Sequence, residues 1–133
     1  MSASFWDVVG NLYELGKALG KTAELRDRRL SQRVRLQCPL RFRMIPVREP
    51  GFRFALAQDI SQNGFRFYSK EFLPRRTGLM VEINPPGHAP IRSLARAVWV
   101  RERQFDEGYE IGGIFVEPPH SARTALTQLI SRR

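Results

Sequence analysis

Hydrophobic and polar positions change their period along this chain of 133 residues. Between residues 4 and 22 apolar side chains recur three and four positions apart, and Ser4 with Asp7 forms a capping box at the start. This pattern predicts an amphipathic N-terminal helix. Residues 23–33 are polar and rich in arginine, which indicates a connector after the helix.

From Val34 onward the period becomes two. Six segments rich in β-branched and aromatic residues follow, separated by turn signals such as Asn63-Gly64 and Pro85-Pro86-Gly87. The predicted strands are Val34–Ile45, Phe52–Ile60, Gly64–Ser69, Leu79–Ile83, Ile91–Arg103 and Tyr109–Val116. Because no helical pattern interrupts them, they predict a mainly β fold, an antiparallel barrel or sandwich. A short helix is predicted after Pro118-Pro119, from about Ser121.

The positive charge of the chain is concentrated in one part of it. The net charge is +9, and 19 of the 22 basic residues are arginine. Residues 26–66 contain ten arginines and three acidic residues, a net charge of +7. Arginine favours planar, bidentate recognition of phosphate or of a base edge, so we expect an anionic partner.

Other features of the composition bear on the compartment. No run of 18 apolar residues occurs, and the N-terminus lacks the basic start and apolar block of a secretory signal. Cys38 is the only cysteine, which fits a reducing compartment, and in a strand it is expected to be a small buried apolar group. We therefore expect a cytoplasmic protein without a transmembrane segment.

Two short motifs carry the candidate chemistry. The first is R-x-x-x-R, from Arg29 to Arg33, with Arg28 directly before it. Its guanidinium groups suit phosphate oxygens, the O6/N7 edge of guanine, or the face of a base. Alone, such a cluster is more often a solvated surface.

The second motif is D-x-S-x-x-G, which runs from Asp59 through Ser61 and Asn63 to Gly64 at a predicted turn between strands. A carboxylate is the natural acceptor for the N1–H and N2–H₂ donors of guanine, a serine hydroxyl both donates and accepts, and glycine permits close approach. Alone, this motif often does no more than close a hairpin. Together the two motifs favour a guanine nucleotide over a simple anion.

In these features the chain resembles the PilZ domain family. The resemblance rests on four segments in the family's order. They are R-x-x-x-R (Arg29, Arg33), the strand Val34-Arg35-Leu36, D-x-S-x-x-G (Asp59, Ser61, Gly64) and the late strand Ile111-Gly112-Gly113-Ile114-Phe115-Val116.

The resemblance implies a six-stranded antiparallel barrel with a C-terminal helix, and cyclic di-GMP as its ligand. By the same resemblance, Arg29 and Arg33 would hold phosphates and a guanine face, while Asp59 and Ser61 would hold a guanine edge and Gly64 would shape the turn. Arg28 resembles the residue of family members that take up a stacked ligand dimer. Asn63, within the turn, completes the candidate ligand-binding set.

Two other classes of function, an enzyme and a nucleic-acid-binding module, fit the sequence less well. An enzyme is disfavoured, because His88 and His120 lie in proline-flanked segments without partner residues, and no metal-ligand spacing occurs. No catalytic residue, metal or cofactor is expected. A basic module that binds RNA or single-stranded nucleic acid is the alternative, since arginines and phenylalanines interleave in the strands. The alternation in Arg41-Phe42-Arg43, Arg53-Phe54 and Phe65-Arg66-Phe67 predicts core rings and exposed arginines, which makes nucleic acid the less favoured partner.

The predicted organisation has two parts. Residues 1–25 form the amphipathic helix and connector, and residues 26–133 form the PilZ domain, with an arginine arm (26–33), a barrel (34–117) and a C-terminal helix (120–132). The N-terminal helix could pack on its own barrel, dock a partner or a second copy, or lie on a membrane surface. We hypothesise that the arm folds over the nucleotide and reorients this helix toward a protein partner.

Overall fold

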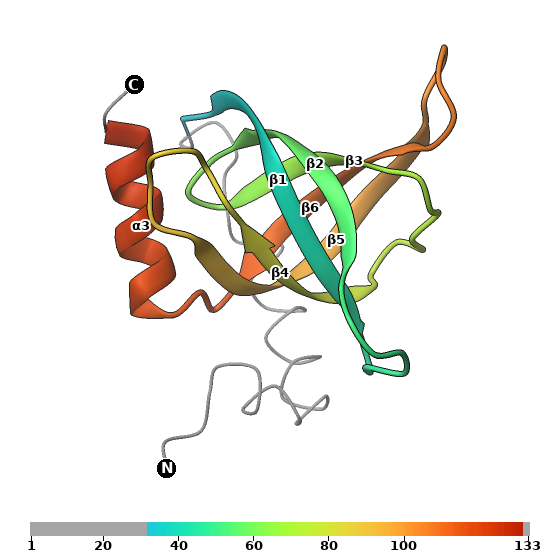
Figure 1. The fold of residues 1–133 in the computed structure, drawn as a ribbon, viewed down its shortest axis with the longest axis horizontal. Coiled ribbons are helices and arrows are strands. Elements are labelled where there is room, and N and C mark those ends of the chain that lie inside the picture. Colours follow the sequence, from blue (N-terminus) through green and yellow to red (C-terminus); the bar gives the residue numbers. More distant parts are fainter. Residues whose placement is uncertain (1–31, 132–133) are drawn as a thin grey trace.

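The computed structural model describes residues 32–131, which form a closed six-stranded antiparallel barrel and one helix (Figure 1). The strands are β1 (Val34–Ile45), β2 (Arg53–Ile60), β3 (Gly64–Ser69), β4 (Gly78–Ile83), β5 (Ile91–Glu102) and β6 (Tyr109–Val116), and the helix is α3 (His120–Ser131). The predicted N-terminal helix and most of the arginine arm, including Arg28 and Arg29, lie outside the described residues.

The six predicted strands are confirmed, and their ends differ by at most one residue. Phe52 precedes β2, Gly78 begins β4, and Arg103 follows β5. The C-terminal helix is also confirmed, and it begins at His120, the first residue of the predicted range 120–132. The division of the chain at residue 25 stays a prediction.

Closure of the barrel depends on pairs of strands that are distant in sequence. The order around the barrel is β1-β2-β3-β6-β5-β4, and β4 pairs with β1 to complete it. Thus β3 pairs with β6, although two strands lie between them in sequence. Closure leaves none of these six described strands with an unpaired edge, so their backbone groups can hydrogen-bond to a neighbour on either side.

Aromatic side chains from β1, β3 and β6 fill the barrel. The ring centroids of Phe42 and Phe67 lie 5.7 Å apart, and those of Phe65 and Phe115 lie 5.0 Å apart. Cys38 belongs to the same core and is buried, as predicted. The helix α3 lies against one end of the barrel (Figure 1), and its buried face (Ala122, Ala125, Leu126, Leu129) joins this core. The motif turn between β2 and β3 contacts this helix, since Gln62 donates to the hydroxyl of Thr127 at 3.1 Å.

The expected alternation of rings and arginines is confirmed at three positions and wrong at a fourth. Phe42, Phe65 and Phe67 are buried, but Phe54 is 77% exposed. In β2 the inward positions near Phe54 are taken by Ala55 and Ala57, which pack in or against the core, so Phe54 must point outward.

Candidate ligand-binding site

A β-bulge in β2 aims Asp59 at the outer face of the barrel. Ala57 pairs with Phe67 of β3 and Asp59 pairs with Arg66, so Gln58 is an extra residue in the ladder. Ala57 and Ile60 both lie in the core, which regular alternation would forbid for positions three apart. The bulge shifts the phase of the strand by one residue, and Asp59 thereby joins the outer face beside the motif turn.

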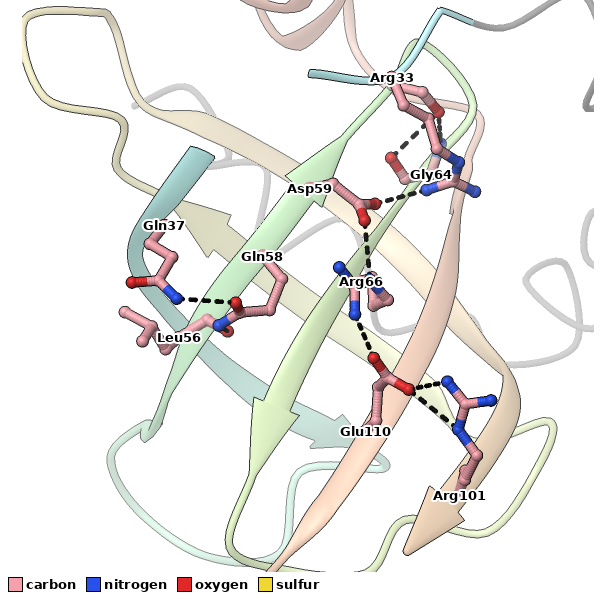
Figure 2. Close-up of polar contacts among 10 residues, drawn as sticks. Arg33, Gln37, Leu56, Gln58, Asp59, Gly64, Arg66, Arg101 and Glu110 are labelled. Atoms are coloured by element: carbon pink, nitrogen blue, oxygen red, sulfur yellow. Dashed lines mark hydrogen bonds and ion pairs between the residues drawn. The ribbon is translucent and has the colours of Figure 1, made fainter. Parts of the chain in front are cut away.

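Asp59 binds two guanidinium groups that come from different segments (Figure 2). Arg33, just before β1, donates through Nη1 to Asp59 Oδ1 at 2.6 Å. Arg66, on β3, donates through Nε to Asp59 Oδ2 at 2.7 Å. The Asp59 side chain is only 10% exposed, although it lies on the outer face. Arg35 of β1 stands opposite Asp59 in register and is exposed. Three arginines around one carboxylate leave this region positively charged.

The ion pairs continue away from Asp59 across β3, β6 and β5 (Figure 2). Arg66 also pairs through Nη1 with Glu110 of β6, and Glu110 pairs with Arg101 of β5. Burial alone would lower the pKa of Arg66, but its hydrogen bonds to Asp59 and Glu110 outweigh burial and raise that pKa. Burial would likewise raise the pKa of Glu110, yet hydrogen bonds from Arg101 and Arg66 lower it. Both residues therefore stay charged over a wide pH range.

The turn that follows Asp59 is held by its own serine. The Ser61 hydroxyl accepts the N–H of Asn63 at 3.3 Å and that of Gly64 at 3.1 Å, and the Ser61 N–H donates to the Gly64 carbonyl at 2.8 Å. Ser61 is 1% exposed, so its hydroxyl is directed into the turn. The Asn63 carbonyl accepts the N–H of Phe115 at 2.9 Å, which ties the turn to β6.

A small pocket of about 240 Å³ lies beside this turn. Gln62, Asn63, Phe115, Pro118 and Arg123 line it, so it lies between the motif turn and the start of α3. Arg123 thus adds a guanidinium group from the C-terminal helix to the surroundings of the motif.

The structure brings together Arg33, Asp59, Ser61, Asn63 and Gly64 from the two motifs, which are distant in sequence. Arg28 and Arg29 lie outside the described residues.

Sequence reasoning counted Arg66 as an exposed strand arginine and missed it as a neighbour of the site. The sequence nevertheless contained a signal for the contact between Arg66 and Asp59. A hairpin closed by the pair Ile60 and Phe65 places Asp59 opposite Arg66.

The family of this chain follows from a match that covers most of its length. The model of the PilZ domain matches residues 27–132. The chain belongs to the PilZ domain family. The matched residues include both motifs, all six strands and α3.

Solved structures with the same fold include other PilZ domains. The PilZ domain of YcgR from Escherichia coli, solved with c-di-GMP, has a TM-score of 0.64 and 14% identity, and the match covers 80% of this chain and 91% of that one. The PilZ domain of CeSA from a cellulose-synthesizing bacterium has a TM-score of 0.53 and 13% identity, with 76% and 96% covered.

A third solved structure is longer than this chain. The inhibitor of motility MotI/DgrA from Bacillus subtilis has a TM-score of 0.65 and 18% identity; the match covers 81% of this chain and 51% of that one. This PilZ chain therefore spans about half the length of MotI/DgrA. At these identities the likeness concerns the fold alone. No match was found among curated protein sequences.

Residues 32–131 contain neither a candidate metal site nor a candidate membrane span. Within that range, no group of three or more His, Cys, Asp or Glu residues could hold a metal ion. No helix in the described part of this PilZ chain is long and apolar enough to cross a membrane.

Proposed function

We propose that this chain is a receptor for the bacterial second messenger cyclic di-GMP. The observation that carries the proposal is the direct contact, at 2.6 Å, between Arg33 of the arginine motif and Asp59 of the turn motif, within a PilZ domain. The PilZ domain of YcgR, which shares this fold, was solved with c-di-GMP, and this supports the same ligand here.

The site offers side chains that suit both the phosphates and the guanine bases of cyclic di-GMP. Arg33 is half-exposed and could move from Asp59 to a phosphate, or share Asp59 with the ligand. Asp59 would accept the N1–H and N2–H₂ groups of one guanine. Ser61 and Gly64 would hold the turn, and Asn63 lies at the edge of the neighbouring pocket. Arg28 and Arg29 are assigned to phosphate or to a second stacked guanine by family resemblance.

The proposed receptor carries out no catalysis, needs no cofactor and acts in the cytoplasm. A nucleic-acid-binding function is less well supported, because three of the rings it would need for stacking (Phe42, Phe65, Phe67) are in the core. Phe54 is exposed, so RNA belongs in the test as a competing ligand.

The test is calorimetric titration of cyclic di-GMP into the wild type and into Arg33→Ala and Asp59→Ala. Arg92→Ala is the matched control, because Arg92 is 53% exposed and pairs with a buried carboxylate elsewhere on the barrel, whereas Arg33 is 48% exposed. We expect micromolar or tighter binding by the wild type and by Arg92→Ala, and its loss in the two site variants. The stoichiometry reports whether one or two nucleotides bind.

GTP and a short single-stranded RNA serve as ligand controls. The receptor proposal is wrong if cyclic di-GMP gives no heat with the wild type. RNA binding that weakens with salt and survives Asp59→Ala would instead support the nucleic-acid module.

We propose further that binding is transmitted through residues 4–33, because the arginine arm joins the predicted helix directly to β1. A ligand can shift only an equilibrium between states that it binds differently. Hydrogen exchange of residues 4–33 should therefore change when ligand saturates the site. Unchanged exchange, with binding intact, would exclude this route of transmission.

A further inference from the structure

We propose that Arg66 is a positioning residue that lets Asp59 distinguish guanine from bases that lack an exocyclic amine. This inference rests on the proposed function, because it assigns a role within the same site. Arg66 lies outside both sequence motifs.

The register of the barrel fixes Arg66 beside Asp59. The two residues are cross-strand partners on β2 and β3, and Arg66 Nε donates to Asp59 Oδ2 at 2.7 Å (Figure 2). The other end of the same guanidinium group pairs with Glu110, which Arg101 holds from β5. Arg66 is therefore held at both ends by carboxylates on neighbouring strands, and it prevents rotation of the Asp59 carboxylate.

Arg33 does not have this role, although it contacts the same carboxylate. Arg33 precedes β1 and its side chain is 48% exposed, whereas Arg66 is within β3 and its side chain is 27% exposed. Arg33 can leave Oδ1 without breaking any strand pairing, and Oδ1 then becomes available to a ligand. Arg66 keeps Oδ2 in place throughout.

The orientation of the Asp59 carboxylate decides which base it can recognise. Guanine presents N1–H and N2–H₂ side by side, and only a carboxylate held edge-on to both can accept from both. Hypoxanthine is the same base without the exocyclic amine. Since a hydrogen bond to a charged group changes binding by roughly 10- to 100-fold, a fixed Asp59 should prefer cyclic di-GMP over cyclic di-IMP by about that factor. A carboxylate free to rotate should lose most of this preference.

The experiment compares the dissociation constants of cyclic di-GMP and cyclic di-IMP for the wild type, Arg66→Gln and Glu110→Gln. The matched control is Glu82→Gln. Glu82 is likewise buried and held by two arginines, Arg41 and Arg92, each at 2.5 Å, but it lies on β4, which pairs with neither β2 nor β3. All variants are also unfolded in urea, so that loss of stability is measured separately.

We expect Arg66→Gln to reduce the preference for cyclic di-GMP to about threefold or less, and Glu110→Gln to reduce it partly. Glu82→Gln should keep the wild-type ratio even where it lowers stability. Loss of one positive charge weakens the binding of both nucleotides alike, so the ratio of their dissociation constants reports on positioning and not on charge. Arg66→Lys should recover affinity for both nucleotides without recovering the ratio, because lysine lacks the fork that bridges Asp59 and Glu110.

The inference is overturned if Arg66→Gln keeps the wild-type ratio of the two dissociation constants. If Arg66→Gln does not fold, the same outcome in Arg66→Lys overturns it. So does a reduced ratio in Glu82→Gln equal to that in Arg66→Gln. These outcomes differ from failure of the proposed function, in which the wild type itself binds neither nucleotide.

Discussion

Gly64 lies against Gly113 across the β3–β6 pairing, so closely that a Cβ on Gly64 would overlap the carbonyl oxygen of Gly113. Gly64 is the last residue of D-x-S-x-x-G, and close approach of two strands explains why it is glycine. Because the clash would be with backbone, no side-chain movement can relieve it.

We therefore expect Gly64→Ala to lower the free energy of unfolding by roughly 1–3 kcal/mol, the usual cost of overpacking. Urea denaturation followed by circular dichroism measures it. Binding of cyclic di-GMP should weaken as well, because the displaced strand carries Arg66 and borders the turn. Gly87→Ala is the comparison: its φ of +75° is strained for alanine, but a Cβ there meets nothing within 4 Å. Equal affinity of Gly64→Ala and wild type would contradict this account of the turn.

Ser61→Ala should lower both stability and affinity. The Ser61 hydroxyl accepts two N–H groups of the motif turn, and an unsatisfied buried donor costs roughly 1–3 kcal/mol. Ser69 is a matched control, since its hydroxyl accepts the N–H of Glu71 at 3.1 Å in the loop after β3 and it too is buried. Denaturation should show a loss in both variants, and calorimetry a loss of cyclic di-GMP affinity in Ser61→Ala alone. Reduced affinity in Ser69→Ala as well would mean that the effect is not specific to the motif turn.

Glu82 should make part of the stability of the barrel dependent on acid. Burial alone would raise its pKa, but hydrogen bonds from Arg41, Arg92 and Asn84 lower that pKa from 4.5 to about 2. Because the folded state favours the charged carboxylate, this contribution is complete above pH 4.5 and is lost as the pH falls toward 2.

Urea denaturation at a series of pH values between 6 and 2 tests this prediction, with the limits set by that pKa shift. The free energy of unfolding should fall less steeply with acid in Glu82→Gln than in the wild type. If the free energy of unfolding fell equally with acid in both proteins, the ion pairs of Glu82 would contribute nothing to stability.

Cys38 should be unreactive in the folded protein. It is 1% exposed, and burial raises the pKa of its thiol to about 11, so the nucleophilic thiolate is scarce at mildly alkaline pH. A thiol reagent such as DTNB should modify it only as the barrel opens, and at once in concentrated urea. Rapid stoichiometric modification without urea would place Cys38 outside the core.

Local patterns in the sequence were sufficient to predict the six strands, the C-terminal helix and the two motifs. Strand propensity, turn residues and a period of two act over a few neighbouring residues, so they can be read without knowledge of the fold. The buried positions of Phe42, Phe65 and Phe67 followed from the same alternation.

The orientation of Asp59 does not follow from the alternation within β2 alone. It depends on the bulge at Gln58, which reverses the phase of β2 between Ala57 and Ile60, and a bulge is decided by pairing with neighbouring strands. The same limit explains Phe54, whose outward orientation is set by the alanines that face the core.

The network from Arg33 through Asp59, Arg66 and Glu110 to Arg101 is a product of the tertiary structure. Its members come from the segment before β1 and from four strands, and β3 becomes a neighbour of β6 only in the folded barrel. The sequence by itself determined which residues are available for binding and on which strands they lie. Closure of the barrel decided which of them touch, because contacts between distant strands depend on packing and register, not on local propensity.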